Sequence, residues 1–334
     1  MRGNAMRKAM LLAPGHSCAM VYGPGQLAAL KGMVELADCR DHCGDLDALR
    51  AELASTEIIC STWGMMCLDE QFLAAAPRLK AVFYGAGSVR GLVTDAMWDR
   101  GIILTSTWAA NAVPVIYYTV SLIVMGMKKA FDTARLVREK RLWARPPAIR
   151  GVYRTRVGVI GVGMIGRGVL SLLRHYDVRT FCHDPFLPAG KARELGAEPL
   201  PLDDIFRTCD VVTLHAANLD STAHMITGRH FRMMKDDALF INTARGRTIV
   251  EPDLIAELKT GRIRACLDVT DPEPPAPDSP LYDLPNVFLT SHLAGAVGEE
   301  CLRMGDYVVE EVRRYCAGEP QACPVTRDMM QWMA

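Results

Sequence analysis

A glycine-rich turn near the middle of the chain constrains the fold more than any other stretch of this sequence. Residues 157–169 read VGVIGVGMIGRGV, an apolar run that ends in Gly161, Gly163 and Gly166 and continues into the helix-like segment GVLSLLRHY. The first glycine permits a tight turn, the second lets a phosphate group approach the backbone, and the third brings helix and strand close together. The helix N-terminus then offers free N–H groups to the anion. The spacing therefore predicts a strand, a phosphate-binding turn and a helix, in that order.

A carboxylate follows this turn at the distance expected of a dinucleotide-binding domain. The next strand-like run, VRTFCHD, ends at Asp184, eighteen residues beyond the third glycine. A carboxylate at this point accepts hydrogen bonds from the ribose hydroxyls of adenosine and repels a 2′-phosphate, and Pro185 and Phe186 add no compensating cation. We therefore predict NAD rather than NADP as the cofactor, with Met164 and Ile165 in the same cofactor-binding loop. The alternative is that Asp184 is a surface residue before a turn proline.

Short apolar runs alternate with helix-length segments on both sides of the turn. Strands are predicted at KAMLLA, EIIC, KAVFY and GIILT in the first part of the chain, and at RVGVIG, VRTFCHD, VVTLHA, ALFINT, RACLDV and VFLTS in the second. Strands that alternate with helices form parallel sheets. The sequence therefore predicts an α/β protein with two doubly wound parallel-sheet domains.

Helical segments complete this outline. Helices are predicted over GQLAALKGMVELA and CLDEQFLAAA. One long helical stretch is predicted from Asn111 to about Trp143, ending at the Arg-Pro-Pro of residues 145–147 because proline cannot continue a helix. The roughly forty residues after Leu293 are too few for a separate domain, so we expect them to pack back on the first domain.

Composition narrows the class of protein. The 334 residues are half hydrophobic, and 38 basic residues balance 38 acidic ones, which argues against a nucleic-acid-binding face. The eleven cysteines form no CxxC pair, so neither a zinc cluster nor a disulfide framework is indicated. No signal-peptide pattern opens the chain, and the longest apolar run, residues 113–127, is too short for a bilayer and is interpreted as a core or interface helix. We expect a cytoplasmic protein with no metal site and no membrane or nucleic-acid partner.

Ionisable side chains follow three of the later strands. Arg245 lies in INTARGR, Asp268 and Glu273 lie in ACLDVTDPEP, and His292 lies in LTSHLAG. In an open parallel sheet, ligands bind outside the carboxyl ends of the strands, so these side chains can meet in one crevice. Each of them alone could be a solvated or packing residue. Their order after a nucleotide-binding turn favours a set that acts together.

These residue types suit hydride transfer to a ketone. The planar fork of Arg245 matches a carboxylate and can also polarise a carbonyl oxygen. His292 can protonate the alkoxide that forms when the hydride arrives. A carboxylate behind the histidine, such as that of Glu273, would orient the ring and favour its protonated form.

Together, these motifs resemble the D-isomer-specific 2-hydroxyacid dehydrogenases, in particular the glyoxylate/hydroxypyruvate reductase and short phosphoglycerate dehydrogenase branches. INTARG, LDV followed by EP, and SHLAG are similar to that family's signatures and stand in the same order. The resemblance covers most of the chain and is weakest over the first seventy residues. It implies that Arg245 binds the substrate carboxylate and carbonyl, that His292 is the catalytic acid/base, and that Glu273 is its partner. The implied substrate is a small 2-oxoacid or D-2-hydroxyacid.

The resemblance also implies further binding residues. The segment YGAGSVRG is similar to the family's substrate loop, which places backbone contacts to the substrate carboxylate at Ala86, Gly87 and Ser88. Asp268 would help to hold the nicotinamide end of the cofactor. Other cofactor contacts are implied at Gly161, Gly163, Gly166, His215, Ala216, Thr243, Ala244 and Gly295.

The family's domain arrangement would explain why the glycine-rich turn comes so late. In the family, the nucleotide-binding domain is inserted into the substrate domain, with the active-site cleft between them. The implied arrangement is an NAD-binding Rossmann domain over residues 113–296, inserted into a flavodoxin-like substrate domain made of residues 1–112 and 297–334. The family also dimerises through the nucleotide-binding domain. The apolar helix from Val113, with Tyr117, Tyr118 and Met125, predicts a homodimer of this kind.

Some residues depart from the family pattern. Ala217 stands in place of a common proline, Ser291 stands in place of the proline in a common TPH, and Ser88, Val89 and Arg90 replace an Asp and Asn after the second glycine of the substrate loop. Arg90 either faces the cleft, where it would favour an acidic or phosphorylated substrate, or is a surface residue that opens a helix.

Two functions remain open at this point. A glutamate at position 273, rather than glutamine, speaks against the formate dehydrogenase branch. The first function is therefore an NAD-dependent oxidoreductase acting on a 2-oxoacid or 2-hydroxyacid. The second is an NAD(H)-sensing interaction protein, similar to the family's corepressor branch, which would bind a protein partner without robust turnover.

Overall fold

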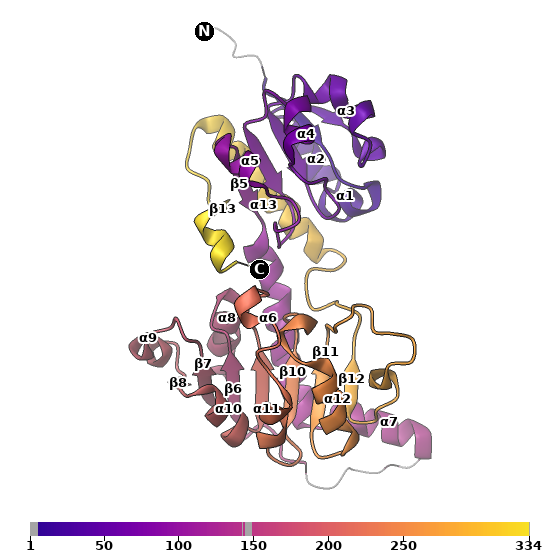
Figure 1. The fold of residues 1–334 in the computed structure, drawn as a ribbon, viewed down its shortest axis with the longest axis vertical. Helices are drawn as coiled ribbons and strands as arrows, with labels where there is room; N and C mark the ends of the chain where they lie inside the picture. The colour runs from indigo at the N-terminus through magenta and orange to yellow at the C-terminus, as the bar shows by residue number, and fades with distance from the viewer. Residues whose placement is uncertain (1–5, 142, 144–148, 334) are drawn as a thin grey trace. The chain divides into compact units, whose positions relative to one another are not determined.

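The computed structural model describes residues 6–141, 143 and 149–333, which divide into two compact units (Figure 1). The first unit comprises Met1–Asn111 together with Ala296–Ala334, and the second comprises Ala112–Gly295. The first unit is therefore built from both ends of the chain. Each unit contains one sheet of mainly parallel strands, which confirms the predicted α/β class with two parallel-sheet domains.

A six-stranded sheet forms the centre of the first unit, in the order β13-β5-β4-β3-β1-β2. Neighbours from β5 to β2 run parallel, whereas β13 is antiparallel to β5. The strands are β1 (Lys8–Leu11), β2 (Glu35–Asp38), β3 (Ile58–Ser61), β4 (Ala81–Tyr84), β5 (Ile103–Ser106) and β13 (Pro324–Val325).

Helices cover both faces of this sheet because side chains of successive strand residues point to opposite faces. Met10, Ile59 and Val82 pack on one face with side chains from α3 (Leu46–Leu53), α4 (Glu70–Ala75) and α5 (Asp95–Asp99). Leu11, Cys60 and Phe83 pack on the other face with side chains from α1 (Gly15–Val21), α2 (Pro24–Lys31) and α13 (Glu300–Ala317). The C-terminal helix α13 is thus part of the core of the first unit.

Two strands of this sheet differ from the sequence prediction. The segment GQLAALKGMVELA is not one helix: α2 ends at Lys31, and Glu35–Asp38 forms the edge strand β2. None of the four residues of β2 is fully buried, so the strand has no apolar run that could have identified it. The other unpredicted strand, β13, has only two residues and also lies at an edge.

A seven-stranded parallel sheet forms the centre of the second unit, in the order β12-β11-β10-β9-β6-β7-β8. The order reverses at β6, as in a doubly wound dinucleotide-binding sheet. The strands are β6 (Arg156–Ile160), β7 (Arg179–His183), β8 (Glu198–Pro199), β9 (Val211–Leu214), β10 (Leu239–Asn242), β11 (Arg264–Leu267) and β12 (Val287–Leu289). Six of them follow the predicted runs, and β8 is a two-residue edge strand that was not predicted.

Helices also cover both faces of the second sheet. One face packs against α10 (Leu202–Thr208), α11 (Gly228–Met233) and α12 (Glu251–Lys259). The other packs against α6 (Trp108–Met127), α7 (Ala130–Lys140), α8 (Met164–Leu173) and α9 (Ala189–Glu194).

The predicted long helix from Asn111 to Trp143 is in fact two helices, α6 and α7. They are separated at Lys129, whose backbone is left-handed with φ of 51°. The carbonyl oxygen of Lys129 accepts hydrogen bonds from both the N–H and the hydroxyl of Thr133, which starts the second helix. The predicted stop at residues 145–147 lies outside the described residues.

Helix α6 is longer than the apolar run that indicated it. It has 20 residues, and within the described part of the chain it is the one helix long and apolar enough to cross a membrane. However, 56% of its most apolar stretch is buried inside the protein, and Val120, Ile123 and Met127 belong to the core of the second unit. Burial of this extent is typical of a core helix, which agrees with the predicted core or interface helix. The prediction that the apolar run is too short to cross a bilayer does not hold for the full 20-residue helix.

Candidate functional site

The glycine-rich turn lies at the carboxyl end of β6 and leads into α8. Gly161 has φ of 83°, and a Cβ atom there would lie 2.6 Å from the carbonyl carbon of His215. A Cβ atom at Gly166 would lie 2.1 Å from the carbonyl oxygen of Gly161, so the close contact of helix and strand requires glycine. At Gly163, by contrast, a Cβ atom would have no neighbour within 4 Å. The turn therefore keeps open space at the second glycine, where a pyrophosphate would approach.

Asp184 follows β7 and lies beside this turn. Its carboxylate accepts hydrogen bonds from the backbone N–H of Val162, at 2.7 Å, and of Phe186, at 2.9 Å. The side chain is thus held against the glycine loop rather than extended into solvent. Each oxygen retains capacity to accept a further hydrogen bond.

His215 closes the other side of the turn, directly after β9. The ring is buried, and burial lowers its pKa to about 3, so the imidazole is neutral. Its Nε2 lies 3.0 Å from the Thr213 hydroxyl, while its Nδ1 is buried without a partner among the described residues. The glycine cradle, Asp184 and this buried ring together fit a dinucleotide at the carboxyl edge of the sheet.

Arg245 follows β10, and neighbouring side chains hold its backbone by hydrogen bonds. Its carbonyl oxygen accepts hydrogen bonds from Asn242 Nδ2 at 3.0 Å and from Thr248 Oγ1 at 2.6 Å. Burial lowers the pKa of the Arg245 guanidinium, and the charge of Glu273 opposes that effect. The guanidinium stays protonated because arginine starts from a very high pKa. A half-buried cation is therefore placed within electrostatic range of Glu273.

The residues around Arg245 fix its loop against the next one. A Cβ atom at Gly246 would lie 2.0 Å from the carbonyl oxygen of Thr270, so only glycine allows the loops after β10 and β11 to touch here. Before Arg245, the Ala244 N–H donates to Asn242 Oδ1 at 3.0 Å, and the hydroxyls of Thr243 and Thr119 on α6 lie 2.9 Å apart.

His292 and Glu273 form a direct pair. His292 Nδ1 lies 2.5 Å from Glu273 Oε1, although the residues come from the loops after β12 and β11. The two side chains are 43% and 39% exposed, so a ligand can reach them. A hollow of about 820 Å³ adjoins the pair and is lined by loop residues that include Thr270, Pro274 and Tyr282. The order of the motifs predicted that these two residues lie at one edge of the sheet, and the structure places them in contact.

Asp268 organises the backbone around His292. Its Oδ1 accepts hydrogen bonds from Leu293 N and Thr290 Oγ1, its Oδ2 accepts one from Ala294 N, and its carbonyl oxygen accepts one from His292 N. Asp268 is almost fully buried. The bonds hold His292 in a left-handed conformation with φ of 55°. Gly295, the last residue of this unit, follows this turn directly.

Sequence reasoning missed two members of this network, Thr290 and Tyr118. The Tyr118 hydroxyl on α6 donates to Thr290 Oγ1 at 3.0 Å, and Thr290 Oγ1 donates to Asp268 Oδ1 at 2.7 Å. Burial raises the pKa of Tyr118, so the phenol remains a donor. Tyr118 stood in an apolar run that indicated packing, and no local motif marked its hydroxyl. The position of Thr290, two residues before His292, could have identified it as a residue near the site.

The predicted substrate loop lies in the first unit, after β4. The Ser106 hydroxyl donates to the carbonyl oxygens of Ala86, at 2.8 Å, and Gly87, at 2.6 Å. These contacts hold the loop by its carbonyl groups. Within the described chain, the N–H groups of Gly87 and Ser88 have no acceptor.

Arg90 is an exposed surface residue, as one of the two interpretations had it, but it does not open a helix. Its Nη2 donates to the carbonyl oxygens of Met330, at 2.6 Å, and Met333, at 2.7 Å, and its Nε donates to Met333 at 3.0 Å. Arg90 therefore fastens the C-terminal segment to the loop after β4. No helix opens at Arg90, since the next one, α5, begins at Asp95.

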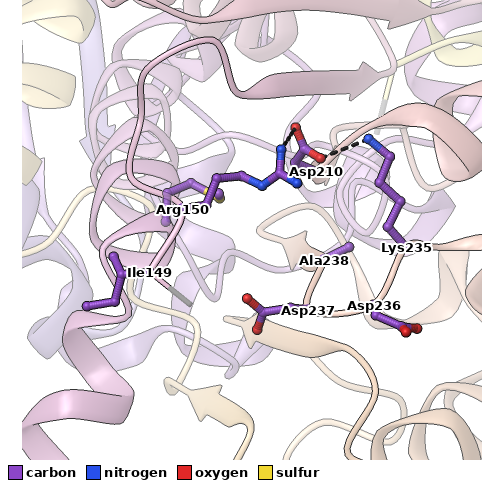
Figure 2. Close-up of a pocket in the computed structure, with 8 residues that line it drawn as sticks. Ile149, Arg150, Asp210, Lys235, Asp236, Asp237 and Ala238 are labelled. Atoms are coloured by element: carbon purple, nitrogen blue, oxygen red, sulfur yellow. Dashed lines mark hydrogen bonds and ion pairs between the residues drawn. The ribbon is translucent and has the colours of Figure 1, made fainter. Parts of the chain in front are cut away.

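A second hollow, of about 430 Å³, lies at the opposite end of the second sheet (Figure 2). It contains Asp210, which precedes β9 and forms ion pairs with Arg150 and Lys235. The other two carboxylates of the hollow, Asp236 and Asp237, pair with cations that do not line it. The hollow adjoins the amino ends of the strands. The described residues also contain no group of three or more His, Cys, Asp or Glu side chains arranged to hold a metal ion.

Comparison with known sequences agrees with this geometry. A family model described as "D-isomer specific 2-hydroxyacid dehydrogenase, NAD binding domain" matches residues 120–294. The chain is 32% identical over 258 residues to a glyoxylate reductase of Korarchaeum cryptofilum, covering 75% of this chain and 77% of the relative. It is 29% identical over 255 residues to a D-3-phosphoglycerate dehydrogenase of Archaeoglobus fulgidus, covering 76% of this chain and 48% of the relative. The chain thus spans about half the length of the phosphoglycerate dehydrogenases that it matches.

Solved structures share the fold over nearly the whole chain. A 2-hydroxyacid dehydrogenase of Ketogulonicigenium vulgare has a TM-score of 0.81 at 23% identity, covering 97% of this chain and 99% of that one. A D-mandelate dehydrogenase of Rhodotorula graminis has a TM-score of 0.79 at 20% identity, covering 96% of this chain and 98% of that one. At these identities the likeness shows the fold alone.

Proposed function

Because the chain belongs to the D-isomer specific 2-hydroxyacid dehydrogenase family, we propose that it is an NAD-dependent oxidoreductase acting on a small 2-oxoacid or D-2-hydroxyacid. The observation that carries the proposal is the contact of His292 with Glu273, within electrostatic range of the half-buried Arg245. These three residues supply an acid/base, its partner and an anion-binding cation at the carboxyl edge of a nucleotide-binding sheet.

We propose that residues at and beside the glycine-rich turn hold the cofactor. In our proposal, the pyrophosphate lies over Gly163 at the N-terminus of α8, and Asp184 accepts the ribose hydroxyls of adenosine. The carboxylate of Asp184 supports a preference for NAD over NADP, because it would repel a 2′-phosphate. Bound in this way, the nicotinamide supplies or accepts the hydride.

Arg245 would hold the substrate by its carboxylate and polarise its carbonyl oxygen. Asn242 and Thr248 hold the backbone of Arg245 by its carbonyl oxygen, and the guanidinium itself donates from Nη1 to the carbonyl oxygen of Ala244 at 2.6 Å. The side chain is therefore partly ordered before a ligand binds. The free N–H groups of Gly87 and Ser88 are proposed to donate to the substrate carboxylate as well. They are suited to this role because the Ser106 hydroxyl holds the loop by the carbonyl oxygens of Ala86 and Gly87. The two N–H groups have no acceptor among the described residues.

His292 would deliver the proton to the alkoxide or remove it from the hydroxyl. Because Nδ1 is engaged by Glu273, Nε2 is the nitrogen left to exchange a proton with the substrate. The carboxylate stabilises the imidazolium and fixes the orientation of the ring. Two carboxylate residues thus position His292: Asp268 holds its backbone, and Glu273 holds its side chain.

We further propose that the chain is a cytoplasmic homodimer that associates through the second unit. All eleven cysteines are free thiols, which suits a reducing compartment. On α6, Tyr117 is 55% exposed and Met125 is 45% exposed, although both are large apolar side chains. Association of two copies along this helix would cover them.

An assay against a panel of 2-oxoacids tests the proposed function. NADH binding is followed by fluorescence, and NADH or NADPH oxidation is followed with glyoxylate, hydroxypyruvate, pyruvate, phenylpyruvate and 3-phosphohydroxypyruvate. We expect turnover of at least one member, with NADH preferred over NADPH. Tight NADH binding without turnover of any member would contradict the enzyme and favour an NAD(H)-sensing interaction protein.

A further inference from the structure

We propose that Glu251 is a positioning residue, which holds the loop after β11 so that Glu273 meets His292. The inference rests on the proposed function, in which Glu273 and His292 are the acid/base pair. It concerns residues 269–275, the segment that carries Glu273. All of these residues belong to the second unit.

Residues 269–275 have few backbone donors with which to hold their own position. Three of the seven are prolines, which have no N–H group. Among the other four, and within the described part of the chain, the Asp271 N–H is the one that donates a hydrogen bond. Its acceptor is Oε2 of Glu251, at 2.8 Å. Glu251 therefore provides the N–H anchor of this segment.

Glu251 is itself held in place, because it begins α12. Leu254 and Leu258 of this helix are buried in the core of the second unit. The Glu251 side chain is buried too, and burial raises its pKa, while the hydrogen bond from Asp271 opposes that effect. A buried carboxylate needs such a donor. The contact thus joins a fixed acceptor to a loop that has few other anchors.

The loop after β10 reaches the same point. A Cβ atom at Gly246 would lie 2.6 Å from the backbone nitrogen of Asp271, so the two loops touch there. Gly246 follows Arg245 directly, and the same stretch of chain continues to Glu251. Asp271 is therefore held by a backbone contact and by a hydrogen bond from one segment. These contacts set the position of Glu273 relative to Arg245.

The contact of Glu273 with His292 depends on this backbone position. Glu273 Oε1 lies 2.5 Å from His292 Nδ1, and the Glu273 side chain is 39% exposed, so packing alone does not hold it. A displacement of about 1 Å in a catalytic group can cost about 10²-fold in rate. Arg245 and the glycine-rich turn have contacts of their own that do not include Glu251. Loss of the Glu251 anchor should therefore lower kcat rather than weaken binding.

Three substitutions of Glu251 test the inference through NADH oxidation with the best 2-oxoacid of the panel. E251A removes the acceptor, and we expect kcat to fall by about 10–10²-fold, with KM for the 2-oxoacid and NADH affinity nearly unchanged. E251Q keeps an oxygen that can accept from Asp271, so it should retain most of the turnover. E251D keeps the charge on a shorter side chain, so its kcat should fall below that of E251Q. If E251A does not fold, the comparison of E251Q with E251D remains decisive.

A double-mutant cycle shows whether Glu251 acts through Glu273. We expect E251A to lower kcat much less in the E273Q background than in the natural protein, because the contact that it would disturb is already altered. The matched control is E257Q, at another buried glutamate of α12, whose carboxylate lies 2.7 Å from Arg262. This control should leave kcat unchanged even if it lowers stability.

The outcomes separate this inference from the proposed function. Equal kcat for E251A and the natural protein would overturn the inference alone. So would an E251D variant as active as E251Q, or a full effect of E251A in the E273Q background. Absence of turnover by the natural protein with every 2-oxoacid of the panel would overturn the proposed function itself.

Discussion

The conformation of His292 shows how much of the site depends on Asp268. A left-handed backbone at a residue other than glycine costs about 1–3 kcal/mol, so the surrounding contacts must hold it. Asp268 does so through Leu293, Ala294 and its bond to His292 N. The histidine is therefore positioned by its backbone as well as by its contact with Glu273.

The Tyr118 hydroxyl extends this support to α6, and its removal is a direct test. Y118F deletes only the donor to Thr290. We expect a loss of about 1 kcal/mol in the free energy of unfolding, measured in urea, because one partly buried hydrogen bond is lost. We also expect lower kcat with KM nearly unchanged, since the loop that carries His292 is held less firmly.

An exposed tyrosine outside the proposed dimer helix supplies the control. Tyr176 is 41% exposed, and its hydroxyl has no hydrogen bond among the described residues, so Y176F removes the same atom without deleting a bond. We expect its stability and turnover to equal those of the natural protein. If Y118F behaves as Y176F does, the relay from Tyr118 through Thr290 to Asp268 has no role.

Sequence reasoning could predict where the charged residues of the candidate site lie, because each follows a strand that could be predicted. Arg245, Glu273 and His292 belong to motifs of fixed order, and parallel strands bring their carboxyl ends to one edge. Arg90 and Tyr118 could not be interpreted in the same way. The partners of Arg90 lie some 240 residues away, and the role of Tyr118 depends on a single hydroxyl in an apolar run.

At the scale of elements, the three glycines of the turn have separable roles. Gly166 is needed for the contact of α8 with the turn, whereas Gly163 borders open space. We expect G166A to destabilise the second unit, because its Cβ atom would collide with the backbone at Gly161. G163A should retain its stability within about 0.5 kcal/mol and yet bind NADH more weakly, because the methyl group occupies the path of the pyrophosphate.

Thermal unfolding and NADH titration of the two variants distinguish these effects. Gly190 in α9 serves as the control, since a Cβ atom there would meet nothing within 4 Å. G190A should leave NADH affinity unchanged and should not lower the unfolding temperature, because alanine favours a helix more than glycine does. Unchanged NADH affinity in G163A would exclude the proposed position of the pyrophosphate.

The elements that sequence reasoning found are those with continuous apolar runs. Each predicted strand is at least three residues long, and half of the ten are buried at every residue. The strands that were missed, β2, β8 and β13, lie at or near sheet edges and have partly exposed residues, so they lack that pattern. The break between α6 and α7 was missed because a left-handed lysine has no sequence signal comparable to glycine.

At the scale of the whole molecule, the order of the chain explains the late position of the glycine turn. The first unit begins the chain and is completed by α13, while the second unit occupies the sequence between. Neither composition nor periodicity shows such an insertion, and it was inferred from resemblance. The predicted substrate loop, residues 85–90, and the His292 loop are consequently far apart in sequence.

The proposed homodimer is tested by mass in solution. Light scattering at micromolar concentration should give twice the 36.8 kDa mass of the chain. Lysine at two exposed positions of α6, in the double variant Y117K/M125K, should give the mass of one chain, because charged side chains cannot be buried unpaired between copies. A single-chain mass for the natural protein would remove the dimer from the proposal.

The most direct test of the proposed chemistry is the rate of NADH oxidation by H292N, measured with the best 2-oxoacid of the panel. His175, exposed after α8, provides the control H175N. We predict that H292N lowers kcat by about 10²–10⁴-fold, as loss of a general acid does, while NADH affinity stays nearly unchanged and H175N retains full turnover. Near-normal turnover by H292N would contradict the assignment of His292 as the acid/base, and with it the proposed mechanism.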